Sequence, residues 1–426
     1  MSNSTHENLQ LSPELLGLSD IKILDVTPKL SEREIIIRVE SIRERVKCRH
    51  CSKPTAKYGH GRLLKLRHLP ILGRKTIIEI LPRRGRCEHC DGNPTTTQTL
   101  DWYEANSKMT KPYEQHLLFE LVNSTVADVS RREEVDYHTI ERLIDRYIET
   151  KTDFSDIVAL GILGFDEISL KKGYRDFVTL VTYRMNEEVR ILGVIKGREK
   201  ADVVQFLKGI PKRLRKTVVV ACCDLYEGYM NAIKEVFKGK VPIVADRFHV
   251  RRLYRKSLVA LRKVELAKLK KSLSQKQYEQ LKPAIALLRK HKDYFSKDEK
   301  KVLDSLFELS PKLKQGYQFS RELSGLFDSE VTPEVAKAKL ADWIARVNDS
   351  ELTCFNTFIK TLIKFEESIC NYFINRYSSG FVEGFNNKVK VLKRRCYGLS
   401  DVTRLFQRLI IDNLGMERFH PAVAAF

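Results

Sequence analysis

The spacing of apolar residues changes along the first third of the chain from a strand-like to a helix-like pattern. Residues 21–47 alternate apolar and polar side chains, and residues 61–82 contain a second short β pattern. From 112 to 149 the apolar residues recur at helical spacing, with a break near Asn123. We therefore expect a small β module followed by a group of short helices.

The remaining two thirds of the chain divide into a mixed part and a helical part. Residues 159–246 alternate short apolar strands with one or two helices, which is typical of an α/β domain. Residues 247–375 are nearly all helical in pattern and rich in Lys, Leu and Glu, and two more helices are expected in 380–413. The pattern predicts an α/β core joined to a large all-helical part.

Length and composition restrict the class of protein. A chain of 426 residues exceeds one ordinary hydrophobic core, and its 42% apolar content is that of a globular protein. We find no run of about 18 apolar residues and expect no membrane partner. Residues 1–20 are polar and lack the charged-then-apolar pattern of a secretory signal, so we expect a cytoplasmic protein.

The formal charge of +21 is concentrated in three blocks of the sequence. The net charge is +11 in residues 41–90, +11 in residues 251–290 and +6 in residues 376–408. Clustered positive charge is what a polyanion-binding surface needs, because each neutralised phosphate releases counterions. For residues 251–290 the best interpretation is a set of solvated helix faces. For residues 41–90 we favour contact with nucleic acid.

Four of the nine cysteines form two Cys-x-x-Cys pairs separated by 35 residues. Two such pairs supply four thiolates, which together make a tetrahedral zinc site. Four sulfur ligands leave no open coordination position, so we expect a structural Zn²⁺. The expected ligands are Cys48, Cys51, Cys87 and Cys90. The other five cysteines are expected to be small buried hydrophobic residues, because a cytosolic chain does not carry a disulfide framework.

The helical segment after the cysteine pairs has the outline of a helix-turn-helix. Ser124 or Thr125 can cap a short helix, and Asp136 can cap the next one. The small core between the helices is expected from Ala127, Val135, Ile140 and Leu143. In such a motif the second helix places its first turn in the major groove of DNA. The expected DNA contacts are Arg131, Arg132, Tyr137, His138, Thr139 and Arg142. An ordinary pair of helices is the alternative.

Two buried-strand patterns in the α/β part each end in an aspartate. The run 159–165 is followed by Asp166, and the run 217–223 is followed by Asp224. An RNase H-like sheet gathers metal ligands in this way, and two divalent ions held there activate the attacking oxygen and stabilise the leaving oxygen of a phosphodiester. A single aspartate at a strand end is usually an ordinary loop residue. The joint pattern is more specific.

A two-metal site needs a third carboxylate, usually from a later helix, and Glu383 is our choice. Helical spacing places it on one face with Asn387, Lys390 and Arg394, which we expect to contact DNA. The apolar residues of the opposite face are Phe381, Phe385, Val389 and Leu392. A carboxylate beside amide and cationic groups suits a site that meets both metal and phosphodiester.

Asp246 and His249 form an Asp-x-x-His pattern after a further apolar strand in residues 241–245. His249 can contact the scissile phosphate or orient a metal ligand. More often, a histidine in this position is a hydrogen-bonded structural residue. We keep the two residues as secondary candidates.

Four segments of the chain resemble the ISL3 family of bacterial insertion-sequence transposases. They are Gly164–Glu167, Cys223–Tyr229, Ala245–Val250 and Gly380–Lys390. The order of zinc pairs, helix-turn-helix and long helical stretch is also similar, so the likeness extends over residues 40–415. The motifs are specific in combination and weak singly. One departure is Ser378-Ser379, where the family pattern has Thr-Asn.

The resemblance implies a catalytic triad of Asp166, Asp224 and Glu383 with magnesium, or manganese, as the metal. It also implies recognition of the inverted-repeat ends of a mobile element, cleavage there, and joining to target DNA. The 158 residues between Asp224 and Glu383 fit a helical domain inserted into the catalytic fold.

The expected domains follow from these patterns. They are an N-terminal segment (1–39), a zinc-binding β module (40–92), a helix-turn-helix domain (105–150), the first part of an RNase H-like core (157–250), a helical insertion (251–375) and C-terminal helices that complete the core (376–426). We expect a homodimer on double-stranded DNA. A DNA-binding regulator without catalysis and a structure-specific nuclease are the rival hypotheses.

Overall fold

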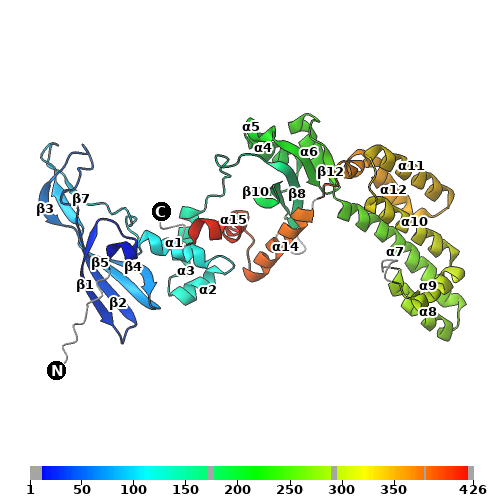
Figure 1. Cartoon of the computed structure of the whole chain (residues 1–426), viewed down its shortest axis with the longest axis horizontal. Helices are drawn as coiled ribbons and strands as arrows, with labels where there is room; N and C mark the ends of the chain where they lie inside the picture. The colour runs from blue at the N-terminus through cyan, green and yellow to red at the C-terminus, as the bar shows by residue number, and fades with distance from the viewer. Residues whose placement is uncertain (1–11, 170–176, 289–294, 379, 421–426) are drawn as a thin grey trace, which may run out of the picture. The chain divides into compact units, whose positions relative to one another are not determined.

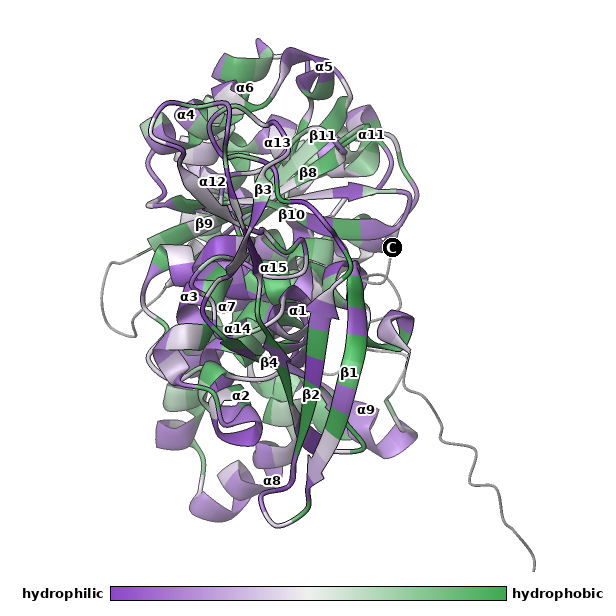
Figure 2. Ribbon diagram, turned by 90° about the vertical axis from the view of Figure 1, so that its left-hand side faces the viewer, coloured by the Kyte–Doolittle hydropathy of each residue, from purple (hydrophilic) through white to green (hydrophobic). Residues whose placement is uncertain are grey.

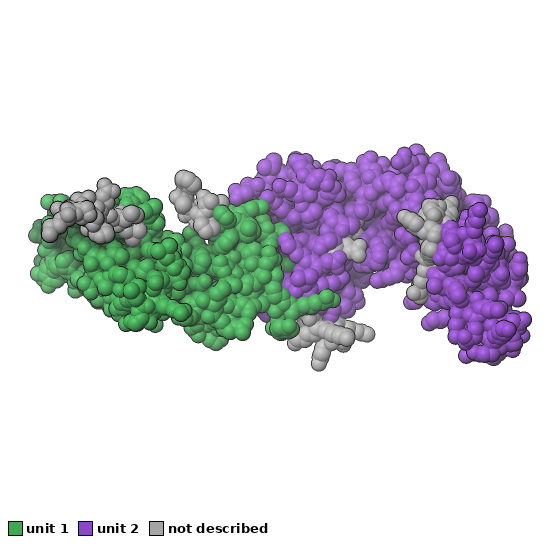
Figure 3. Space-filling model, turned by 60° about the horizontal axis from the view of Figure 1, so that its bottom comes forward, with its two compact units in different colours: residues 1–149, 394–397, 407–426 green, residues 150–393, 398–406 purple. Residues whose placement is uncertain are grey.

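The chain forms two compact units, which are coloured separately in Figure 3, and Figure 1 labels their helices and strands. The computed structural model describes residues 12–169, 177–288, 295–378 and 380–420, and of Glu383 it describes the backbone alone. Unit 1 comprises residues 1–149, 394–397 and 407–426. Unit 2 comprises residues 150–393 and 398–406.

A four-stranded sheet lies near the start of unit 1, after the short helix η1 (Pro13–Leu16). In the order of pairing its strands are β1 (Ile21–Lys29), β2 (Glu34–Ser41), β5 (Arg74–Ile80) and β4 (Leu64–Ile71). β2 and β5 run parallel, and the outer pairs are antiparallel. Every second side chain of β2 is buried, from Ile35 onward, and Figure 2 shows its alternating bands of hydropathy. This alternation places one face of β2 in the core with Leu66 and Ile78.

A smaller three-stranded sheet carries the cysteine pairs. Its strands pair in the order β3 (Ala56–His60), β6 (Arg83–Arg86) and β7 (Thr95–Thr97). Gly85 in β6 is required by close packing, because a Cβ there would lie 1.8 Å from the hydroxyl of Thr55. The boundary that we expected at residue 40 falls inside β2. Residues 21–39 therefore belong to the same sheet as β4 and β5 and are not a separate segment.

Three short helices follow in unit 1: α1 (Lys111–Glu120), α2 (Val126–Glu133) and α3 (Tyr137–Tyr147). The side chain of Thr125 caps α2, and that of Asp136 caps α3. Between them Glu134 takes a left-handed conformation with φ of 52°, which makes the turn tight. Ala127, expected in the core, is exposed on α2, and Val129 is the residue that α2 buries.

The end of the last helix, α15 (Val402–Phe419), belongs to unit 1 from residue 407 onward. Arg408 is buried and donates hydrogen bonds to the carbonyl oxygens of Leu121, at 2.9 Å, and Ser124, at 2.7 Å. Asp412 accepts a hydrogen bond of 3.1 Å from the amide of Asn123. We had assigned all of 376–426 to the catalytic core. These polar contacts are the reason that its last part groups with the short helices instead.

Unit 2 is built on a mixed five-stranded sheet. Its strands pair in the order β10 (Glu188–Lys196), β9 (Phe177–Met185), β8 (Gly161–Ser169), β11 (Val218–Cys223) and β12 (Ile243–Ala245). β8, β9 and β10 are antiparallel, whereas β11 pairs in parallel with both β8 and β12. The carboxyl ends of β8, β11 and β12 therefore lie at one edge of the sheet. The helices between these strands are α4 (Lys200–Gly209), α5 (Lys212–Arg215) and α6 (Glu227–Phe237).

A helical region follows β12, as the hydropathy pattern predicts. Its α-helices are α7 (Arg247–Ser272), α8 (Gln275–Leu287), α9 (Lys297–Leu309), α10 (Pro311–Asp328), α11 (Pro333–Asp349), α12 (Asn356–Lys364) and α13 (Glu366–Cys370). Two short 3₁₀ helices, η3 (Thr353–Phe355) and η4 (Asn371–Phe373), lie among them, and α14 (Gly380–Arg395) follows. None of the helices in the described residues combines the length and the apolar composition that crossing a membrane requires.

Candidate functional site

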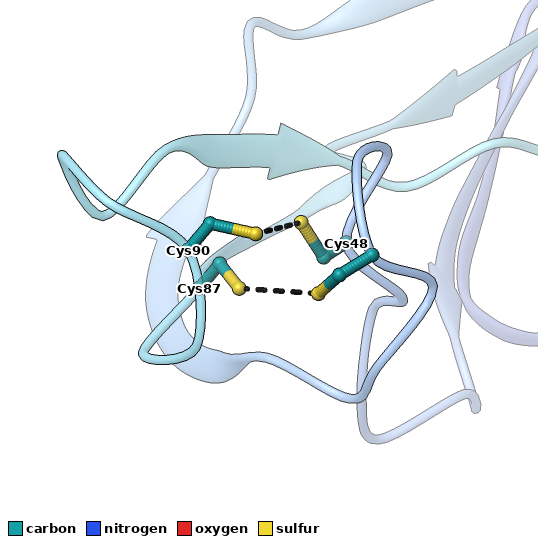
Figure 4. A group of neighbouring side chains, drawn as sticks. Cys48, Cys87 and Cys90 are labelled. Atoms are coloured by element: carbon teal, nitrogen blue, oxygen red, sulfur yellow. Dashed lines mark hydrogen bonds between the residues drawn. The ribbon is translucent and has the colours of Figure 1, made fainter.

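The four thiols of the two cysteine pairs meet in one cluster. Cys48 and Cys51 lie in the loop between β2 and β3, and Cys87 and Cys90 follow β6. The Sγ atoms of Cys48 and Cys90 are 4.0 Å apart, and those of Cys51 and Cys87 are 3.6 Å apart (Figure 4). A tetrahedron with Zn–S bonds of about 2.3 Å has edges of about 3.8 Å. The cluster therefore has the dimensions of a four-sulfur zinc site.

Backbone amides donate hydrogen bonds to a sulfur atom in each cysteine loop. The amide of His50 donates to the Sγ of Cys48, and the amide of His89 donates to the Sγ of Cys87, each at 3.4 Å. The amides of Cys51 and His50 lower the pKa of Cys48 to about 6. Thiolates are the form that binds zinc, and four of them complete its coordination. The residues present fit one structural zinc ion.

The first turn of α3 presents the side chains that sequence reasoning assigned to DNA. Tyr137 is 42% exposed, and the His138 side chain is 78% exposed. Arg142 is exposed and donates a 2.9 Å hydrogen bond to the hydroxyl of Thr139. His138 and Thr139 lie one turn before Arg142, so these three side chains share one side of the helix, and Tyr137 is at its exposed start.

Arg131 and Arg132, the other two expected DNA contacts, are exposed at the end of α2. Arg131 forms an ion pair with Asp128 of the same helix. Arg132 forms an ion pair of 2.5 Å with Glu120 of α1. Both guanidinium groups are thus held by carboxylates of unit 1 and are placed beside the turn that leads into α3.

In unit 2, Asp224, Asp246 and His249 gather at the carboxyl edge of the sheet. Asp224 follows β11, and Asp246 follows β12 and caps α7 by accepting a 2.8 Å hydrogen bond from the amide of Phe248. The Nε2 of His249 lies 3.0 Å from Asp224 Oδ1. One ligand atom from each of the three residues lies within 4.8 Å of the others. The two secondary candidates therefore lie directly beside Asp224.

Asp166 lies within β8 and not at its end, because β8 continues to pair with β9 as far as Ser169. Its Oδ1 accepts a 2.6 Å hydrogen bond from the amide of Glu167, and its Oδ2 accepts one from the side-chain amide of Asn386. Both carboxylate oxygens are thus oriented by neighbouring donors.

Burial and like charge raise the pKa values of the two central carboxyl groups. Burial raises the pKa of Asp166. Burial, followed by the charges of Asp166 and Asp246, raises the pKa of Asp224 to about 8. Negative groups crowded in a half-buried place favour an added cation. The chemistry of this donor set fits a divalent metal ion.

Helix α14, which carries Glu383, packs closely against β8. A Cβ on Gly164 would lie 2.3 Å from Val382 and 2.9 Å from Phe381, so only glycine permits this approach. The expected faces of α14 are observed on either side of this contact. Its buried residues include Phe385, Val389 and Leu392, and its exposed residues include Asn387, Lys390 and Arg394. The Glu383 side chain itself lies outside the described part of the structure.

Asn386 is a site residue that sequence reasoning missed. It is 6% exposed, donates to Asp166 and, among the described residues, leaves its side-chain oxygen without a hydrogen-bond partner. A second tie between α14 and β8 is the 2.6 Å hydrogen bond from Lys393 Nζ to the carbonyl of Ser169. The available signal was the spacing of Asn386 three residues after Glu383, which places both on one side of the helix.

Three family models match consecutive parts of the chain. A model for the ISL3 type of DDE domain, described as a transposase, matches residues 163–409. The helix-turn-helix domain of transposase family ISL3 matches residues 98–148. The zinc finger of the transposases of IS204, IS1001, IS1096 and IS1165 matches residues 28–90.

Two proteins are similar to the chain over different lengths. The transposase for insertion sequence element IS1001 of Bordetella parapertussis is 25% identical over 363 residues, which is 85% of this chain and 87% of that protein. A protein of Lactococcus lactis subsp. lactis named ATP-dependent protease is 29% identical over 128 residues, which is 29% of this chain and 39% of that protein. The first likeness extends over nearly the whole chain, and the second is partial.

Zinc should hold the small sheet of unit 1 together. We expect one zinc ion per chain in the reduced full-length protein, and we expect Cys48→Ser to lose it and to unfold β3, β6 and β7. Structural zinc binding of about 10–16 kcal/mol is folding free energy in such modules. Metal analysis and limited proteolysis measure both effects. Cys354→Ser, at a half-buried cysteine of unit 2, should keep the zinc. Absence of stoichiometric zinc from the unsubstituted protein would contradict this assignment.

Proposed function

We propose, since this chain belongs to the ISL3 family of transposases, that it binds the inverted-repeat ends of an insertion sequence, cleaves the DNA there with divalent metal ions and transfers the freed 3′ end to target DNA. The observation that carries the catalytic part is the cluster of Asp224, Asp246 and His249 at one edge of the sheet, with Asp166 on the neighbouring strand β8. A DNA-binding domain alone would have no use for buried, crowded carboxylates.

We propose that the sheet of unit 2 is an RNase H-like core with a helical insertion. The strand order, with three antiparallel strands followed by two parallel ones, supports this assignment. The helices α7 to α13 lie in the sequence between β12 and α14, where an insertion would separate the second aspartate from the glutamate.

Asp166 and Asp224 are the residues that would hold magnesium or manganese, with Glu383 of α14 as the third carboxylate. When bound, a pair of such ions activates the attacking oxygen and stabilises the leaving oxygen of a phosphodiester. The protein orients its own ligands in advance. The Glu167 amide and Asn386 fix the two oxygens of Asp166, and His249 holds Asp224 through their 3.0 Å contact.

Each unit would make its own contacts with DNA. The first turn of α3 would enter the major groove of an element end, with Tyr137, His138, Thr139 and Arg142 toward the bases and Arg131 and Arg132 toward the backbone. The exposed face of α14, with Asn387, Lys390 and Arg394, would contact the strand near the carboxylates. A homodimer on double-stranded DNA would present one such set of residues to each end.

The reaction would occur in two attacks on phosphorus. Water attacks the phosphodiester at the element end and releases a 3′ hydroxyl. That hydroxyl then attacks a phosphodiester of the target, forms the new phosphodiester bond and displaces the 3′ oxygen of the target strand, so the protein forms no covalent bond to DNA.

Two rival functions share part of the machinery. A regulator would bind end DNA without cutting it, and a structure-specific nuclease would cut without joining. Incubation of the protein with labelled end DNA, a target duplex and magnesium separates all three. Joined products are the result expected of the transposase.

The recognition helix should read bases. We expect His138→Ala and Arg142→Ala to lower the affinity for element ends by roughly 5- to 150-fold and to leave affinity for random duplex nearly unchanged, because a specific base contact contributes about 1–3 kcal/mol. Competition binding with the two duplexes measures this. Arg418→Ala, at an exposed arginine of α15, is the control and should change neither affinity. Equal losses on both duplexes would reassign these residues to phosphate contact.

Removing one negative ligand should abolish cleavage. Asp166→Asn, Asp224→Asn and Glu383→Gln each keep the shape of the side chain, and we expect each to slow cleavage by on the order of 1,000-fold or more, since several kcal/mol of transition-state stabilisation depend on the bound metal. A double substitution should be scarcely worse than a single one, because the three act as a unit. Binding of end DNA should persist.

Asp246→Asn, measured in the same cleavage assay, tests whether Asp246 or Glu383 is the third metal ligand. If Glu383→Gln cleaves at a near-normal rate and Asp246→Asn does not cleave, the third ligand is Asp246 and the assignment of Glu383 is wrong.

Asn386 should affect metal binding by orienting the carboxylate of Asp166. We expect Asn386→Ala to weaken binding of Mn²⁺ to the full-length protein by about 10- to 100-fold, the usual effect of losing a group that orients a metal ligand. Titration followed by electron paramagnetic resonance measures the affinity without any reaction. Lys388→Ala, at an exposed position of the same helix, is the control. Unchanged Mn²⁺ affinity in a folded Asn386→Ala protein would show that Asn386 only packs.

A further inference from the structure

A cavity of about 390 Å³ adjoins the carboxylate site and shares Asp224 and His249 with it. This volume lies in the range of ligand sites in proteins, about 300–1,000 Å³. The other walls are mainly aromatic and basic. They include Tyr226, Tyr229, Phe365, Arg198 and Arg252.

The aromatic surface of the cavity is fixed by contacts on several sides. The guanidinium carbon of Arg198 lies 4.5 Å from the ring centre of Phe177 and 5.2 Å from that of Tyr226. The same guanidinium donates a 2.9 Å hydrogen bond to Glu167, which holds it in place. The rings of Tyr226 and Tyr229 meet edge to face, with centres 5.1 Å apart. Tyr226 is therefore oriented before any ligand arrives.

The ring of Tyr226 occupies the space that a side chain at position 228 would need, so glycine is required there. A Cβ at this position would lie 2.4 Å from the ring, so any other residue would displace it. Here φ is not in the left-handed region, and the glycine is required by the close approach alone.

The helical region closes the cavity from another side. Thr361 comes from α12, Phe365 ends that helix, and Arg252 comes from α7, where it is exposed. Helices that lie between β12 and α14 in the sequence thus complete a wall next to Asp224.

We propose that this cavity receives one nucleotide of a DNA strand, adjacent to the phosphodiester that reaches Asp224. The base lies outside the helical stack against Tyr226 and Phe365, and the backbone charge faces Arg252. This inference rests on the proposed function. A phosphodiester carries a nucleotide on each side, so a cavity that shares Asp224 lies within reach of one of them.

The chemistry of the walls favours a nucleotide over other small ligands. Aromatic side chains stack on any base, and arginine offers both a planar surface and a partner for phosphate. A base has to leave the duplex to enter such a cavity, and it does so most easily beside a nick or at a strand end. The element end after cleavage and the target strand are the two sources of such a nucleotide.

Abasic DNA combined with a protein substitution tests the proposal. Single abasic nucleotides are placed at successive positions around the cleavage site of the end DNA and, separately, around the joint in the target duplex. Cleavage and joining by the full-length protein are then measured under single-turnover conditions. We expect Tyr226→Ala to slow one of these steps by roughly 5- to 150-fold on intact DNA, the range for losing one stacked base. At one abasic position the substitution should have no further effect.

The position at which the effect of Tyr226→Ala vanishes identifies the nucleotide, and the DNA that contains it identifies the source. Tyr226→Phe keeps the ring and should react within about 2-fold of the unsubstituted protein, since stacking carries the effect. Tyr278→Ala, at a half-exposed tyrosine of α8, is the matched control and should have no effect.

Thr361→Met fills the cavity from α12 without removing a packed side chain, so it tests the proposal if Tyr226→Ala does not fold. We expect the same loss of rate. The proposal is overturned if both folded variants react normally, or if no abasic position in either DNA removes the effect of Tyr226→Ala. Failure of the unsubstituted protein to cleave and join would instead overturn the proposed function.

Discussion

Crowding of carboxylates at one edge of the unit 2 sheet is the constraint on which much of that unit depends. Parallel pairing of β11 with β8 and β12 brings Asp224 and Asp246 to the same edge, and its register places Asp166 of β8 beside Asp224. Burial there destabilises the charged forms, and the pKa of Asp224 rises to about 8. The neighbouring groups offset part of this cost, because amide donors and His249 meet the carboxylate oxygens. Carboxyl groups crowded in this way favour binding of a divalent cation.

In unit 1 the ionisable groups that lie close together are the four cysteine thiols. Strands β3, β6 and β7 have 5, 4 and 3 residues, which is too short to bury an apolar face of their own. Four thiolates brought together without a metal would repel one another. A bound zinc ion coordinates all four of them and so stabilises the small sheet. The basic residues of this module can then stay at its surface.

Local patterns predicted the parts of the molecule that depend on local physics. The alternation in residues 34–41 and the helical spacing in residues 247–375 reflect which side chains face a core, and both are observed. The end of β8 could not be found this way, because pairing with β9 extends the strand beyond Asp166. Ala127 was expected in the core, but the approach of α2 to its neighbours buries Val129 instead. Asn386 was missed since its role exists only where α14 meets β8.

The helices between β12 and α14 do more than connect two parts of a site. α7 starts at Asp246 and carries His249 in its first turn, so the orientation of this helix sets the groups beside Asp224. α12 supplies Thr361 to the wall of the adjoining cavity. A short loop in place of these helices could return the chain to α14, but it would leave Asp224 open to solvent on that side. Metal-bound phosphodiesters react best where water is excluded and charges are fixed. Two helices of this region, α7 and α12, therefore shield Asp224 on one side.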